Sequence, residues 1–475
     1  MSAPLLWIVL PGFLAGLLYM VRRWQRMTTI FGVMIAIGLA WLAWILPIGE
    51  TISLGPLPFL SSFELDPTLT ILGRRFVIDN GIRPVLPLVY LSAALWFGGA
   101  SIARVTRLFT PLGLGIAALL TAALSVDPFL YAALLIEMAV LVSVPILSPP
   151  GRPPGRGVLR FLTFQTMGML FILFTSWMIR GGELNPGDAA LVPLASLLMA
   201  LGFAFFMAIF PFHTWIPMLS EEVHPYAAAF ILFMLPGITS LFALGLFERY
   251  TWLRSLPVIF LGLGFVGALM VVIGGVWAAF QRHLGRMMGY AVIVEIGMSL
   301  LALSLGLRGD GGILHLEIVF AMFLPRGLSL AIWALALTAI QNCSQGLLFR
   351  EVQGLGRRLP YATTGLVLAH FSLAGLPLLA GFPVHVALWS TLASQTLPVA
   401  VLALFGNTGL LVGAIRTLVV LVMGPSEEKW HSTESWPQRL LLATGGGLLL
   451  ILGLMPQWFI PALAGVAQLW HTPTP

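Results

Sequence analysis

The sequence predicts an all-α polytopic membrane protein with about 14 transmembrane helices. Of its 475 residues, 59% are hydrophobic and only 9% are charged, whereas an ordinary soluble domain has about 45–50% apolar and about 25% charged residues. Apolar runs of about 18 to 25 residues recur from end to end, and each is long enough to cross a hydrocarbon layer of about 30 Å as a helix. The strand-period alternation expected of a membrane barrel is absent from the sequence. These observations exclude a soluble globular protein and indicate that the bilayer is its solvent.

Short polar segments separate the apolar runs and set the limits of each predicted span. The predicted spans are 4–21, 28–46, 84–103, 109–126, 128–147, 159–179, 189–210, 226–247, 256–279, 286–306, 314–339, 361–382, 398–423 and 438–468. We expect the last span to bend at Pro456 because proline interrupts a helix. Residues 47–83 contain the alternating stretch RRFVID, which predicts a short external hairpin.

The charged residues and the cysteine content restrict partners, cofactors and orientation. A formal charge of +6 spread over the whole chain is too dilute for nucleic-acid binding. The single cysteine, Cys343, excludes an internal disulfide and an iron–sulfur site, so any redox cofactor belongs to another chain. The N-terminus lacks a basic region, so its apolar run is read as a retained span and not as a signal peptide. With the N-terminus outside, 15 basic residues fall in inner loops and 7 in outer loops, which places both termini on the outer side.

Two glutamates fall near the middle of predicted spans. Glu137 lies nine residues after Pro128, and Glu295 lies nine residues after Arg286, which puts both about 13–14 Å into a core of about 30 Å. An acidic side chain at this depth costs about 2.5–3.5 kcal/mol and marks a candidate site by default. The alternative is a protonated glutamate that bonds a neighbouring helix.

Two proline-containing segments predict broken helices inside the membrane. AIFPFHTWIP places Pro211 and Pro217 around His213, and AGLPLLAGFPVHVALW places Pro377 ahead of His385. Broken helices free backbone groups that protein or water must satisfy, and in transporters they often mark the conduction site. Both segments contain the pattern F-P-x-H, which suggests an internal repeat. A histidine there either relays protons or makes a structural hydrogen bond.

Two other patterns favour ordinary structural roles. Gly262, Gly264 and Gly267 spell G-x-G-x-x-G inside an apolar span, where helix packing is a better interpretation than dinucleotide binding. Glu221 and His224 are interpreted as a loop pair, since a third metal ligand is not near them in the sequence. The sequence therefore offers no catalytic residue and no metal site.

Four motifs in this order resemble the antiporter-like proton-pumping membrane subunits of complex I (NADH:quinone oxidoreductase), a family with relatives in Na⁺/H⁺ antiporter and membrane-bound hydrogenase complexes. In DPFLYAALLIE, Glu137 follows Asp127 by ten residues. This resembles the family's spacing between the start of the fifth span and its essential glutamate, which falls on Glu137. PFHTWIPMLSEEVHP resembles PFHxWLPDAHxEAPTP, with Glu222 on the acidic position, and QRHLGRMMGYAVIVEIG resembles QxDLKRLLAYSSISxxG. SLAGLPLLAGFPVH resembles SLAGxPPLAGFxxK, and Arg416 and Gly424 resemble the end of the thirteenth span.

The resemblance implies two inverted five-helix repeats, each with a broken helix, and a row of charged residues at the bilayer centre. On this basis we expect N-terminal helices with the hairpin at 1–108, a first repeat at 109–250, a second repeat at 251–424, and a C-terminal loop and helix at 425–475.

The departures from the family pattern concern its lysines. The lysine of the seventh span falls on Phe206, and that of the eighth span falls on Pro236 or Gly237. Because a nearby cation stabilises a carboxylate, Glu137 is expected to spend most of its time neutral. In the eleventh span the basic position falls near Leu324, and Arg326 is a substitute that does not release its proton.

The resemblance implies a membrane-arm subunit of a complex I-like, redox-driven proton-translocating assembly, not catalytic alone. The expected pathway residues are Glu137, Glu295, His385 (in place of a family lysine), His213, His315 and Arg326. It implies flavin and iron–sulfur clusters on partner subunits, other membrane and peripheral subunits as partners, and quinone bound only through the assembly. It also implies an energy-transducing membrane, the inner membrane of a bacterial or archaeal cell.

Two alternatives stay open. The missing lysines favour a non-conducting scaffold between active antiporter-like subunits. A cation/proton antiporter module without redox partners is the other.

Overall fold

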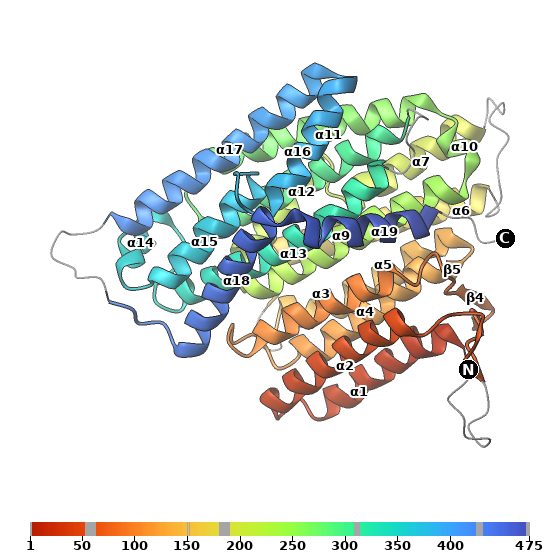
Figure 1. Cartoon of the computed structure of the whole chain (residues 1–475), viewed down its shortest axis with the longest axis horizontal. Helices are drawn as coiled ribbons and strands as arrows, with labels where there is room; N and C mark the ends of the chain where they lie inside the picture. The colour runs from red at the N-terminus through yellow and green to blue at the C-terminus, as the bar shows by residue number, and fades with distance from the viewer. Residues whose placement is uncertain are drawn as a thin grey trace.

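The computed structural model describes residues 2–52, 63–149, 151, 153–179, 191–307, 314–423 and 431–471. Figure 1 shows helices that run side by side, with short strands close to the N-terminus. Within the described ranges, nine helices are long and apolar enough to cross a membrane, and five shorter apolar helices of 10–17 residues accompany them. The chain is a multi-pass integral membrane protein, as its composition predicted.

The helices and strands follow the order of the predicted spans. In the first half they are α1 (Leu10–Met20), α2 (Gln25–Ile45), β1 (Thr51–Ile52), β2 (Phe63–Glu64), β3 (Thr68–Ile71), β4 (Arg74–Val77), α3 (Val85–Ala100), α4 (Phe109–Ser125), β5 (Val126–Asp127), α5 (Ala132–Leu147), α6 (Arg156–Met178), α7 (Leu191–Phe206), α8 (Trp215–Glu222) and α9 (Pro225–Arg249). In the second half they are α10 (Thr251–Arg254), α11 (Pro257–Phe280), α12 (Leu284–Ser304), α13 (Leu314–Gln341), α14 (Phe349–Val352), α15 (Pro360–Leu373), α16 (Gly381–Gln395), α17 (Leu397–Val422), α18 (Trp436–Leu454) and α19 (Ile460–His471).

The predicted hairpin is present, and β3 pairs antiparallel with β4, which in turn pairs with β5. The last span is interrupted at Pro456, where α18 has ended and α19 has not begun.

The predicted span 361–382 is wrong in extent, because α15 ends at Leu373 and α16 extends the apolar segment to Gln395. Gly375, two residues after the end of α15, has φ +74°, the left-handed conformation that glycine adopts without strain. Four of the basic residues counted for the orientation lie outside the described residues: Arg152, Arg180, Arg308 and Lys429. The same is true of Gly424 from the motif comparison.

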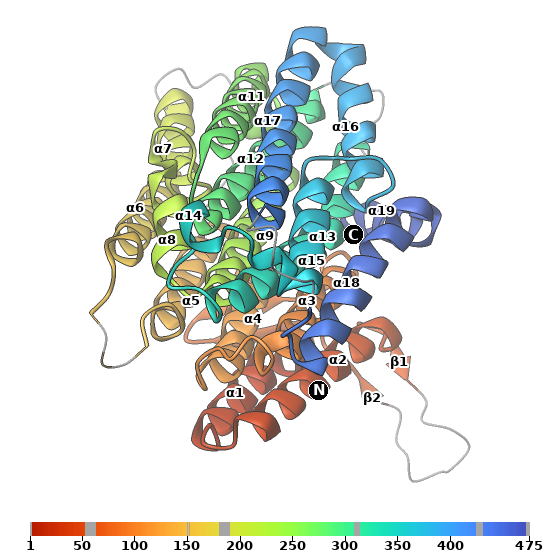
Figure 2. The same ribbon diagram turned by 90° about the vertical axis from the view of Figure 1, so that its left-hand side faces the viewer.

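Two helices form the centre of the molecule. Every residue of α9 from Pro225 to Leu246 is buried, and α13 is buried to a similar extent. A helix that is apolar on all sides belongs in a core and not at an interface with water. In Figures 1 and 2 the N-terminal helices α1 and α2 lie at one edge of the molecule, far from α11 and α17. Large apolar side chains such as Trp41 on α2 are exposed, as expected of a surface that faces lipid.

Glycines allow α11 to pack closely against its two neighbours. A Cβ atom on Gly275 of α11 would overlap the backbone of Gly406 on α17, and one on Gly406 would overlap the carbonyl group of Val271. On the other side, a Cβ on Gly267 would lie 2.9 Å from the carbonyl oxygen of Gly297 on α12. Membrane helices associate through such small residues because lipid supplies no hydrophobic driving force. Gly267 thus has the packing role that the sequence predicted.

The helix break between α15 and α16 is held by two serines. Ser329 Oγ of α13 donates a hydrogen bond of 2.9 Å to Ser372 Oγ of α15. The amide of Gly381, at the start of α16, donates a hydrogen bond of 3.2 Å to the same oxygen. These bonds satisfy a backbone group that the break frees. The two hydrogen bonds therefore fix the position of the start of α16, the helix that carries His385.

Candidate functional site: buried charges beside a broken helix

A buried ion pair joins α12 and α13. Arg326 Nε lies 2.9 Å from Glu295 Oε2, and the two side chains are only 8% and 3% exposed. Arg326 Nη2 also donates hydrogen bonds to the Glu295 carbonyl oxygen at 2.8 Å and to Ser299 Oγ at 2.7 Å. Glu295 lies eleven residues after Leu284, about 16 Å along α12 and thus near the middle of the membrane. Charges at this depth persist only when they are paired and hydrogen-bonded.

His385 extends this pair from α16. Its Nε2 lies 3.4 Å from Glu295 Oε1, and the imidazole is 3% exposed. Its Nδ1 has no hydrogen-bond partner among the described residues. The ring fits here because position 375 is glycine, where a Cβ would lie 2.8 Å from Nδ1. Glu295, Arg326 and His385 together form the central cluster.

A small cavity opens into the central cluster. Its volume is about 10 Å³, and Glu295, Arg326, Ser372 and His385 supply its polar lining. A space of this size holds about one water molecule, which needs two to four polar partners. The cluster thus combines a fixed cation, a carboxylate, a titratable imidazole and space for one water. This arrangement can hold a proton on His385 and pass it to water or to the carboxylate.

Glu137 has a different environment on α5. Its side chain is buried, and Oε1 accepts a hydrogen bond of 2.7 Å from Thr166 Oγ1 of α6. Among the described residues, Oε2 has no hydrogen-bond partner, and no basic nitrogen lies within 4 Å of the carboxylate. The two sides of the molecule therefore differ, since Glu295 has a buried cation beside it and Glu137 has a hydroxyl.

The positions where the family lysines would fall are buried and apolar. Phe206 ends α7 and is 2% exposed, and its carbonyl oxygen accepts a hydrogen bond of 3.2 Å from Gln165 Nε2. Pro236 lies within α9, and its carbonyl oxygen accepts a hydrogen bond from Ser240 Oγ. Neither site is open to water. A lysine at either position would therefore need a hydrogen-bonded partner, and the side chains present there, Phe206 and Pro236, form no such charged pair.

Two predicted relay histidines lie apart from the central cluster. His213 sits in the turn between α7 and α8, where its half-buried ring stacks on Phe210 with centroids 5.5 Å apart. His315 lies one residue after the first residue of α13 and is half-buried. The structure thus brings together three of the six predicted pathway residues, and Glu137, His213 and His315 occupy separate places.

Comparison with known proteins identifies the family. The family model described as "NADH:quinone oxidoreductase/Mrp antiporter, TM" matches residues 164–411, which are 248 of the 475 residues. The chain belongs to this antiporter family. NADH-quinone oxidoreductase subunit N of Ectopseudomonas mendocina is 26% identical over 62% of this chain and 61% of its own length. NADH-quinone oxidoreductase subunit 14 of Thermus thermophilus is 29% identical over 68% of this chain and 73% of its own length.

The fold of the antiporter family extends over the whole chain. A chain in the structure of the Mrp complex from Dietzia sp. DQ12-45-1b superimposes with a TM-score of 0.78, covering 100% of this chain and 98% of that one, at 17% identity. The sequence matches are shorter, since the chain spans less than two thirds of the length of the first curated relative. The resemblance drawn from the four motifs is confirmed at the level of the family and the fold.

Several polar residues of the site were not predicted from this antiporter-family sequence. Ser299 follows Glu295 by four residues, and this helical spacing is a signal from which it could have been found. Thr166 and Ser372 act across helices, and nothing in the linear sequence points to their partners. His370 is fully buried on α15 against Trp333, with ring centroids 4.2 Å apart and no hydrogen-bond partner for either nitrogen in the described part of the chain.

The predicted pairing of Glu221 with His224 is wrong. Glu221 Oε2 instead accepts a hydrogen bond of 2.6 Å from Arg286 Nε of α12 and forms an ion pair with Arg286 Nη2 at 2.5 Å. The reason is that Glu221 lies in the last turn of α8, which packs along α12, so the contact between these helices determines its partner. This ion pair ties the first broken helix to the second half of the chain.

The start of α12 carries a pH-dependent cap. His283 Nδ1 accepts a hydrogen bond from the amide of Arg286, and burial lowers the pKa of His283 below its usual range. In the unfolded chain His283 binds a proton near pH 6.5, and in the folded chain it does so only at lower pH. The contribution of His283 to the free energy of unfolding is therefore fully present above about pH 6.5 and is lost as the pH decreases.

His283→Asn keeps an acceptor for the cap and removes the titration, and caps of this kind contribute about 1 kcal/mol. We expect the difference in unfolding temperature between pH 7.5 and pH 5.5, measured in detergent, to be smaller in this variant than in the wild type. An unchanged difference would show that His283 does not carry the effect.

Proposed function

We propose that this chain is a membrane-arm subunit of a complex I-like assembly in which electron transfer on other subunits drives proton movement. The observation that carries the proposal is the central cluster of Glu295, Arg326 and His385, buried at mid-membrane beside the broken helix α15–α16. Two buried charges and a titratable ring are costly in lipid, and such groups mark ion pathways more often than they support a fold.

The three side chains of the central cluster have different roles in the proposed proton site. Arg326 stays charged and keeps Glu295 ionised, since a guanidinium does not release its proton in proteins. His385 is the member whose imidazole can take up and release a proton. A proton on His385 would form a second cation beside Glu295 and compete with Arg326 for the carboxylate. The geometry therefore supports a proton site at His385 whose affinity depends on how closely Arg326 approaches Glu295.

The half of the chain around Glu137 supports a degenerate pathway. Glu137 bonds to Thr166 and has no described basic partner within 4 Å, so among the described residues no cation is placed beside it to change its affinity for protons. His213 and His315 are proposed as secondary relay groups at the first break and at the start of α13. The same observation favours the second candidate, a scaffold that connects active antiporter-like subunits without conducting.

The partners follow from the names of the relatives, which are NADH-quinone oxidoreductase subunits. The proposal places flavin and iron–sulfur clusters on peripheral subunits, other antiporter-like chains beside this one, and quinone binding elsewhere in the assembly. It places the chain in the inner membrane of a bacterial or archaeal cell with both termini outside, on the basis of the positive-inside distribution.

The composition of the native particle tests this proposal. A tagged copy of the chain is extracted from its own membranes in mild detergent, and the co-purifying proteins are identified by mass spectrometry and absorption spectra. We expect iron–sulfur and flavin proteins in the same particle. A particle that contains only antiporter-like and small membrane proteins would contradict the proposal and support the antiporter module.

A further inference from the structure

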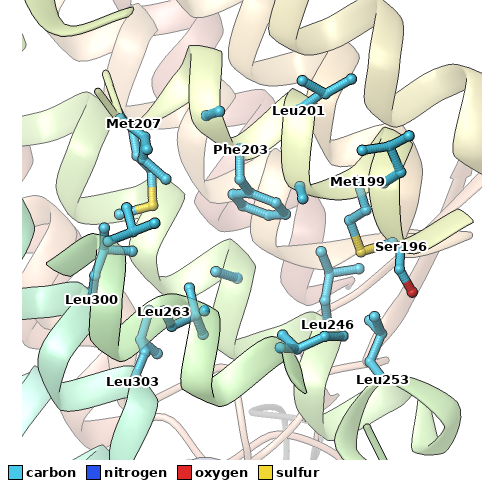
Figure 3. A pocket seen from close by; sticks show the side chains of 18 of the residues that line it. Ser196, Met199, Leu201, Phe203, Met207, Leu246, Leu253, Leu263, Leu300 and Leu303 are labelled. Atoms are coloured by element: carbon cyan, nitrogen blue, oxygen red, sulfur yellow. The ribbon is translucent and has the colours of Figure 1, made fainter. Parts of the chain in front are cut away.

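A large apolar cavity lies between α7, α9, α11 and α12, and its lining includes no residue of the central cluster. Its volume is about 530 Å³, and of the 22 described residues that line it Ser196 alone has a polar side chain. Figure 3 shows the leucine, methionine and phenylalanine side chains that converge on it. Protein interiors rarely contain voids much larger than a water molecule, and this volume is that of a small-molecule site.

The cavity is elongated along the helices. Along α7 and the residue that follows it, the lining runs from Ser196 to Met207, a distance of about 16 Å at 1.5 Å per residue. In Figure 3, Ser196 and Leu253 lie toward one end of the cavity, and Met207 and Leu300 lie toward the other. A hydrocarbon core of about 30 Å contains two leaflets of about 15 Å. The cavity therefore has the length of one leaflet, from the membrane surface to the midplane.

One side and one end of the cavity indicate what occupies it. The lining residues Leu197, Phe210 and Val258 are 57%, 46% and 69% exposed, so the cavity opens sideways to lipid. At the surface end Ser196 Oγ is buried without a hydrogen-bond partner among the described residues. Beside Leu253 at the same end, Arg254 is 48% exposed and lies 3.8 Å from Glu248.

We propose that the cavity binds one membrane phospholipid. One acyl chain lies along α7 down to Met207, the Ser196 hydroxyl donates to an ester carbonyl, and the phosphate lies beside Arg254. The hydrocarbon lining excludes a polar ligand, and the leaflet length and the cation at the surface end match a lipid tail and its headgroup. Enclosure by four helices distinguishes this lipid from the surrounding bilayer, because it should stay bound when detergent replaces the rest.

A photoreactive lipid tests the site. The full chain is reconstituted in vesicles of phosphatidylcholine and phosphatidylglycerol with a minor fraction of phosphatidylcholine that carries a diazirine at the end of one acyl chain. The protein is extracted in detergent, purified and irradiated, and the adducts are mapped by mass spectrometry. We expect adducts on the peptides around Met207 and Val266, at the deep end of the cavity, and few on α2.

Gly262→Phe supplies the matched variant. Gly262 lines the cavity, and a Cβ there meets no atom within 4 Å, so a phenyl ring enters without a clash. Gly16 on α1 is equally open and exposed, so Gly16→Phe is the control. We expect Gly262→Phe to lower the yield of adducts in detergent about tenfold, a change of about 1.4 kcal/mol in binding, and Gly16→Phe to leave it unchanged.

Irradiation in the vesicles before extraction labels lipid-facing α2 in every folded variant and checks insertion. Equal yields in detergent for wild type and Gly262→Phe, or no adducts at the deep end, would overturn the proposal. The position of the phosphate is tested by Arg254→Gln, which should also lower the yield. An unchanged yield in that variant would overturn the placement of the phosphate beside Arg254.

Discussion

Replacing Arg326 with methionine should destabilise the protein by about 3–5 kcal/mol, the usual cost of removing one partner of a buried ion pair. Methionine keeps most of the side-chain volume but leaves the Glu295 carboxylate without its cation at mid-membrane, where both side chains are almost fully buried. Ser299 Oγ and the Glu295 carbonyl oxygen also lose a donor. The measurement is the thermal unfolding temperature of the purified chain in detergent.

The double variant Glu295→Gln/Arg326→Met separates the charge from the packing. A neutral glutamine does not need the cation, so we expect the double variant to recover most of the lost stability. The reason is that the penalty of an unpaired buried charge exceeds the net contribution of the pair itself. If the double variant were as unstable as Arg326→Met, packing around Arg326 would explain the loss, and the ion pair would not.

Gly406→Val should be the second severe substitution, with a loss of about 3 kcal/mol, the upper end of the usual cost of overpacking. The added side chain meets the backbone of Val271 on α11, and backbone cannot move aside as a flexible side chain can. The helices α11 and α17 must therefore separate, which also removes the contact between Gly409 and Gly275.

Gly38→Val on α2 controls for the general effect of valine in a helix. Position 38 is in the middle of a span, and a Cβ there meets no atom within 4 Å. We expect its unfolding temperature to stay close to that of the wild type. A similar loss in both variants would mean that helix propensity, and not the contact between α11 and α17, causes the effect.

Composition and hydrophobic period were sufficient to predict the membrane fold and the position of most apolar helices, because a helix in lipid must be apolar over its whole length. The same period failed at 361–382. There, α16 continues the apolar segment to Gln395, and a left-handed glycine divides it from α15. A hydropathy pattern records that residues lie in the membrane but not where a helix stops within it.

The candidate site was predicted residue by residue but not as an arrangement. Glu295, Arg326 and His385 were each notable because charged and titratable groups are rare at mid-span. Their contact depends on the packing of α12, α13 and α16, and side chains that meet across helices have no fixed spacing in sequence. Thr166 was missed for the same reason, although it is the hydrogen-bond partner of Glu137.

The contrast between the two halves follows from single substitutions. The chain has one lysine, Lys429, which lies outside the predicted spans, so no predicted span offers an ammonium group that could approach and leave Glu137. In the motif comparison, Arg326 is a substitute near the basic position of the eleventh span and His385 takes the place of a family lysine, and of the two side chains only the imidazole can exchange its proton. The proposed function therefore assigns proton transfer through this chain to His385 more than to Glu137.

The ratio of protons moved to electrons transferred, measured in vesicles with the purified assembly, tests most directly whether buried ionisable groups of this chain carry protons. The variants are His385→Gln, which keeps an N–H group for Glu295 but has no ring that exchanges a proton, and Glu317→Gln, which neutralises a glutamate in the first turn of α13. We expect His385→Gln to lower the ratio while electron transfer continues, and Glu317→Gln to leave the ratio unchanged. An unchanged ratio in His385→Gln would contradict a proton site at His385.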